Sequence, residues 1–113
     1  MFLLYSPPEV RASPEMRASF DQWVAYGQSL HDAGVHVGDN PLQGLETATT
    51  VRVRDGETLI SDGPFAETKE MLGGYYLVDL PSHEAAVEWA ARVPNAPYGS
   101  IEIRPVMELP DAP

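Results

Sequence analysis

Cysteine is absent from this chain of 113 residues, and basic residues are scarce, with seven lysines and arginines against 17 aspartates and glutamates. Without cysteine, neither a disulfide nor a thiolate metal site can form. A formal net charge of −10 leaves no cationic surface to displace counterions from phosphates, and it disfavours anionic membranes for the same reason. We therefore expect neither a nucleic-acid partner nor a membrane partner.

Long apolar runs are also missing. The apolar run at the N-terminus covers residues 2–5, with no basic region before it, which is too short for a signal peptide or a membrane span. A cytoplasmic location is the resulting expectation. The length predicts a single domain over residues 1–108 and a frayed tail over 109–113.

Periodicity predicts an α+β fold. Residues 2–5 indicate a buried strand, and Ser13-Pro14-Glu15 indicates the start of a helix that ends at Gly34. Gly27 lies on the apolar stripe of this helix, where it predicts a close approach to a sheet. The remaining expected elements are a strand at 35–37, a hairpin of 49–54 and 57–61 turning at Asp55-Gly56, a helical turn or loop at 66–72, a strand at 74–80, a helix from Ser82 to Pro94 and a strand at 100–107.

Without the hairpin, this order is a ferredoxin-like β-α-β-β-α-β unit. Two helices can cover only one face of such a sheet, yet the strands at 2–5 and 75–80 carry apolar residues on both faces. A symmetric second copy is the simplest cover for the other face. The pattern therefore predicts a homodimer.

The polar segment 62–70, which reads Asp-Gly-Pro-Phe-Ala-Glu-Thr-Lys-Glu, and the following Leu-Gly-Gly-Tyr-Tyr of 72–76 resemble the YCII-related family, in its branch named for an Asp-Gly-Pro-Phe motif. Further pieces of the resemblance are residues 33–35, 49–52, 84–90 and 101–106. The resemblance implies a dimeric α/β barrel built from two ferredoxin-like protomers. It also implies a regulatory link, because genes of this branch often neighbour sigma factors of the extracytoplasmic-function type.

Some members of the wider family are linked to a His-Asp pair and to dehydrochlorination of hydroxylated aromatics. Their histidine lies in the first turn of the first helix. The corresponding residues 13–17 of this chain include no histidine, so that pair is not carried over.

Asp62 is the strongest candidate for a catalytic base, because it follows a strand directly and Gly63-Pro64 presents it on a tight turn. The alternative is that its carboxylate only accepts backbone N–H groups. Glu67 and Lys69 lie near the same turn. Lys69 is the only lysine and is a candidate anchor for a carboxylate or phenolate, with a structural salt bridge as the alternative.

Three further residues are candidates. Tyr75 lies on the strand face opposite Tyr76, where it either orients a ligand or bonds across a dimer interface. Phe65 is a candidate ligand contact, although a core plug is the commoner role. His36 is a candidate base with Asp62 as its orienting partner.

Together these features predict a cofactor-free acid–base enzyme that acts on a small, aromatic or anionic molecule near the 62–70 segment. The alternative is a non-enzymatic regulatory or ligand-sensing module. No metal or cofactor is expected, because no second histidine–carboxylate set and no phosphate-binding glycine loop stand at useful spacing.

Overall fold

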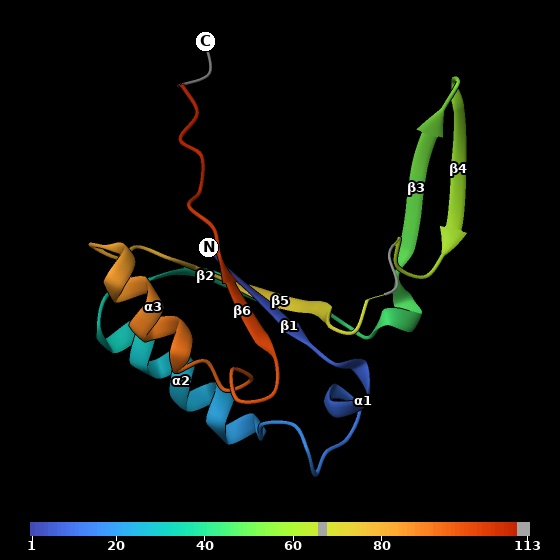
Figure 1. Cartoon of the computed structure of the whole chain (residues 1–113). Coiled ribbons are helices and arrows are strands. Elements are labelled where there is room, and N and C mark those ends of the chain that lie inside the picture. The colour runs from blue at the N-terminus through green and yellow to red at the C-terminus, as the bar shows by residue number, and fades with distance from the viewer. Residues whose placement is uncertain (66–67, 111–113) are drawn as a thin grey trace.

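The computed structural model describes residues 1–65 and 68–110. Its main sheet contains, in spatial order, β2 (His36–Pro41), β5 (Met71–Val78), β1 (Phe2–Ser6) and β6 (Ser100–Ile103), and every neighbouring pair is antiparallel. Helices α2 (Phe20–Asp32) and α3 (His83–Ala91) cover one face of this sheet (Figure 1). The arrangement is α+β and compatible with the predicted ferredoxin-like unit.

The core lies between this sheet face and the two helices. On β1, residues alternate, so that Phe2 and Leu4 are buried under the helices. Tyr26 of α2 stands edge-on to Tyr76 of β5, with ring centroids 5.3 Å apart, and its hydroxyl donates to the Trp89 carbonyl at 2.9 Å. The buried hydrophobic residues are Phe2, Leu4, Tyr26, Leu30, Tyr76, Ala86, Ala90 and Val93.

The first long helix begins later than the sequence pattern indicated. A short helix, α1 (Pro8–Arg11), is followed by turns, and α2 begins after Ser19. The Ser19 hydroxyl accepts from the Gln22 backbone N–H at 3.2 Å, while Gln22 Oε1 accepts from the Ser19 N–H at 2.7 Å. This capping box gives two reciprocal hydrogen bonds. A helix start at Ser13 would place Met16 at the position of Gln22, and a methionine side chain cannot accept the hydrogen bond from the cap N–H as glutamine does. The predicted start at Ser13 is therefore wrong.

Gly27 does not bring α2 onto the sheet. A Cβ atom built at Gly27 would meet no atom within 4 Å. Phe20 and Val24, on the same side of the helix, are 80% and 53% exposed. This side of the N-terminal half of α2 therefore makes no close contact with the sheet and leaves space beneath it, while Tyr26 packs on Tyr76.

The predicted hairpin is confirmed as β3 (Thr49–Arg54) and β4 (Glu57–Asp62). Asp55 and Gly56 both adopt positive φ, 51° and 76°, as a type I′ turn requires. The hairpin forms a sheet of its own, which we call the arm, and it stands away from the main sheet on the side opposite the helices (Figure 1). Val51 and Val53 lie on one face of the arm, about 60% exposed.

Other boundaries shift by a few residues. A 3₁₀ turn, η1 (Leu45–Thr47), precedes the arm. β5 begins at Met71, so part of the expected turn or loop at 66–72 is strand, while residues 66–67 lie outside the described residues. β6 ends at Ile103 because Pro105 has no N–H for a ladder. The tail predicted at 109–113 lies largely outside the described residues.

Among the helices of the described residues, none combines the length and the apolar character that a membrane crossing requires.

Candidate functional site

The space beneath the N-terminal half of α2 is a cavity of about 520 Å³, within the size range of small-molecule sites. Its boundary includes aromatic side chains, two arginines and one aspartate. The residues around it are Leu4, Ser6, Arg11, Arg17, Ala18, Phe20, Trp23, Val24, Gly27, Asp39, Asn40, Pro41, Gly73, Gly74, Tyr75, Tyr76, Asn95 and Tyr98. Helix α2, three strands of the sheet and the 94–99 turn therefore all contribute to the walls of one open cavity.

Two glycines form part of the cavity floor. Leu4 pairs with Gly74 and Tyr5 with Leu72, so Gly73 is the extra residue of a bulge in β5. A Cβ atom on Gly74 would lie 2.9 Å from the carbonyl oxygen of Asn40. The close pairing of β5 with β2 therefore requires glycine at position 74, and this part of the floor carries no side chain.

A histidine–carboxylate pair lies at the edge of this cavity. His36 Nε2 is 2.6 Å from Asp39 Oδ2, and both residues belong to β2. Asp39 contributes to the cavity wall, whereas His36 stands behind it and stacks on His31 of α2 at 4.0 Å. The pair therefore presents the carboxylate to the cavity and holds it from behind with the imidazole.

Tyr76 is the cross-strand partner of Asp39. Its side chain is buried, and burial together with the nearby Asp39 carboxylate raises the pKa of Tyr76 to about 12. Its hydroxyl makes no hydrogen bond to any residue in 1–65 or 68–110. Tyr76 therefore stays protonated at neutral pH and can donate to a molecule in the cavity.

The raised pKa predicts alkaline destabilisation. A folded-state pKa of about 12 against 10 in the unfolded chain gives stability that is complete below pH 10 and is lost as pH rises toward 12. The free energy of unfolding, measured with urea, should be lower at pH 11.5 than at pH 8. Tyr76→Phe should reduce this difference by about 2 kcal/mol. An equal fall in Tyr76→Phe would contradict this assignment.

The sequence-predicted residues do not gather around this cavity, with the exception of Tyr75. Its hydroxyl accepts from Asn40 Nδ2 at 2.8 Å, and Tyr75 contributes to the wall. Asp62 ends β4, exposed and opposite Thr49, and Phe65 is 76% exposed. His36 contacts Asp39 rather than the predicted partner Asp62. Their catalytic and ligand-binding roles stay predictions, and Glu67 lies outside the described residues.

Lys69 belongs to a second, wide-open hollow, of about 1250 Å³, at the ends of β1 and β6. Glu9, Glu70 and Glu102 also line this outer hollow, and Glu70 accepts a hydrogen bond from Ser100 Oγ at 2.7 Å. Three carboxylates against one lysine make it less suited to an anion than the cavity beneath α2.

Asp39 was missed because the strand was expected to end at residue 37, whereas β2 continues to Pro41 and includes Asp39. In β2 the register shifts between His36 and Gly38, which turns His36 and Asp39 to the same side. The residue types around a bulge of this kind do not identify it in the sequence. Arg17 was missed because the expected helix start at Ser13 placed it inside a helix, and Arg11 was missed because no helix was expected at residues 8–11.

Among the described residues, no three histidine, aspartate or glutamate side chains come together in a way that could hold a metal ion.

An antiparallel four-stranded sheet with two helices on one face and a cavity beneath one of them defines a small α+β domain with a candidate site beneath α2. The model of the YCII-related domain matches residues 1–110, so the chain belongs to the YCII-related family. It is also 49% identical over 61 residues to an uncharacterized protein of Rhizobium meliloti (strain 1021). That match covers 52% of this chain and 49% of the relative, about half of its length.

Proposed function

We propose that the chain is a cofactor-free acid–base enzyme that acts on a small aromatic or anionic molecule in the cavity beneath α2. The observation that carries the proposal is the Asp39 carboxylate, held by His36 at 2.6 Å and placed beside its cross-strand partner, a protonated Tyr76, in the wall of the cavity. A positioned carboxylate with a neighbouring hydrogen-bond donor is the minimal equipment for moving a proton at a carbon next to a carbonyl.

In the proposed reaction, Asp39 Oδ1 accepts the proton from the carbon beside the carbonyl. The electron pair of the broken C–H bond moves into the carbonyl, and the oxygen that becomes negative accepts a hydrogen bond from the Tyr76 hydroxyl. His36 occupies Oδ2 and fixes the orientation of the carboxylate. Return of the proton to carbon restores the ketone, so that the net result is exchange or isomerisation.

Cyclohexanone and 4-oxocyclohexanecarboxylate are suitable probes, one neutral and one anionic. In deuterated buffer, the chain is expected to accelerate deuterium incorporation at the ring carbons beside the ketone, followed by NMR. Failure with both probes, at concentrations that perturb cavity resonances, would contradict the enzymatic proposal and favour the ligand-sensing alternative.

We also propose a homodimer, and membership of the Asp-Gly-Pro-Phe branch on the strength of residues 62–65. Support for the dimer comes from the uncovered outer side of the sheet and from the arm, whose side chains Val51, Val53 and Ile60 are each about 60–70% exposed. A two-stranded hairpin has little stability alone in water, so this arm gains most from packing on a second copy.

A single lysine on the apolar face of the arm should disrupt such a dimer. Val53→Lys is expected to shift the chain from dimer to monomer in size-exclusion chromatography with light scattering, because a charge would be buried without a partner. Arg54→Lys places the same side chain on the opposite face and should leave the dimer intact. A monomeric unmodified chain at micromolar concentration contradicts the dimer.

A further inference from the structure

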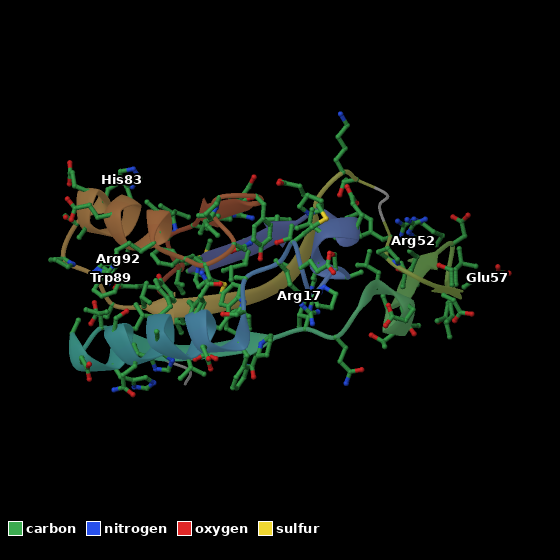
Figure 2. All side chains as sticks on the ribbon, turned by 90° about the horizontal axis from the view of Figure 1, so that it is seen from below. Arg17, Arg52, Glu57, His83, Trp89 and Arg92 are labelled. Carbon is green, nitrogen blue, oxygen red and sulfur yellow. The ribbon has the colours of Figure 1, made fainter. Side chains whose placement is uncertain are left out.

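The cavity beneath α2 holds two of the seven basic residues of the chain, Arg11 and Arg17. Arg11 Nη2 donates to the Leu42 carbonyl oxygen, and Arg17 Nη1 donates to the Arg11 carbonyl oxygen at 3.1 Å. Figure 2 shows Arg17 just beyond the N-terminal end of α2. Backbone carbonyls thus hold both guanidinium groups, and each retains further N–H donors.

Neither arginine forms an ion pair with a carboxylate of the described residues. The side-chain ion pairs of residues 1–65 and 68–110 are His36–Asp39 and Arg104–Glu102. In a chain with 17 acidic residues, two arginines at one cavity without an acidic partner create a local positive potential that favours an anion. Guanidinium groups bind carboxylates best, through paired N–H donors.

The distance between the arginines and the Asp39–Tyr76 pair limits the length of the ligand. The Arg11 guanidinium lies over Gly73, 3.4 Å from the position of a Cβ atom there, whereas Asp39 pairs with Tyr76. Gly73 and Tyr76 are three residue steps apart along β5, which corresponds to about 10 Å between their backbone positions. One six-membered ring with substituents at opposite ends fits this span.

The shape of the cavity favours a flat ring. Gly73 and Gly74 leave part of the floor without side chains, and the aromatic residues Trp23 and Tyr98 contribute to the walls. Aromatic side chains pack well against planar ligands. Size, flatness and charge therefore point to the same class of molecule.

We propose that the ligand is a cyclic, planar monocarboxylate with a hydroxyl or keto oxygen at the far end of the ring. Arg17 and Arg11 bind its carboxylate, and the opposite oxygen reaches Tyr76 and Asp39. The proposal deepens the proposed function and rests on it for the role of the far end, while the carboxylate subsite stands on the arginines alone.

The test compares 4-hydroxybenzoate with its neutral analogue 4-hydroxybenzamide by isothermal titration calorimetry. The acid should bind about 10- to 100-fold more tightly than the amide, the usual value of hydrogen bonds to a charged group. Arg17→Gln should remove this difference, and Arg17→Lys should restore part of it. Arg54→Gln, which removes a charge from the exposed arm, should leave the difference unchanged.

The outcomes separate the two proposals. Equal affinity for acid and amide, or no binding of the acid at millimolar concentration, overturns the carboxylate subsite. An acid preference that survives in Arg17→Gln overturns it as well. Acid binding that depends on Arg17, without deuterium exchange in any ketone probe, supports the subsite and contradicts the enzymatic function. Exchange in cyclohexanone together with equal affinity for acid and amide supports the enzymatic function and overturns the carboxylate subsite.

Discussion

Replacement of Asp39 by asparagine is expected to reduce the rate of deuterium exchange in the ketone probes by about 10²- to 10⁴-fold, the usual contribution of a positioned general base. Asparagine keeps the size and one oxygen of the side chain but cannot accept the proton. Because Asp39 is 42% exposed on its side chain, the substitution should leave the fold intact. The rate measured by NMR at saturating probe reports the effect directly.

Asp62→Asn is the matched control, because it makes the same chemical change at the acid that the sequence favoured. Asp62 is exposed at the end of β4 and should tolerate the change with exchange unaltered. Loss of exchange in Asp62→Asn, with Asp39→Asn fully active, would move the site to the 62–70 segment and restore the original prediction.

The strands and the arm were predictable because their signals are local. Alternation of apolar residues, the Asp55-Gly56 turn and the Ser82 cap each act over a few residues, and the structure confirms them. The order of the four strands follows from the sequence of elements.

The cavity was not predictable, because it depends on two features that the pattern does not reveal. One is the capping box at Ser19, which shortens the first long helix and leaves Arg17 outside it, while Arg11 ends the short helix α1. The other is the pair of bulges, which places Gly73 in the floor and turns His36 toward Asp39. Both bulges depend on the register in which strands distant in the sequence pair. The periodicity of a single sequence contains little information about that register.

The largest stability effect is expected from Gly99→Ala. The 94–99 turn packs on the end of β1, where Asn95 Nδ2 donates to the Tyr5 carbonyl at 3.1 Å and to Ser6 Oγ at 2.9 Å. A Cβ atom on Gly99 would overlap the Tyr5 carbonyl oxygen and lie 3.1 Å from both Asn95 Nδ2 and Ser6 Oγ. The backbone and the buried side chains cannot move aside without a large energetic cost. We therefore expect the free energy of unfolding to decrease by about 3 kcal/mol or more.

The same substitution at Gly27 should have the opposite sign. Gly27 lies within α2, and a Cβ atom there would meet no atom within 4 Å. Alanine in a helix interior is more favourable than glycine by about 1 kcal/mol, so Gly27→Ala should stabilise the chain by that amount. Urea unfolding of both variants measures the two effects against the unchanged protein. Destabilisation by Gly27→Ala would mean that α2 lies closer to the sheet and that the cavity is smaller, which would weaken the case for a ligand beneath this helix.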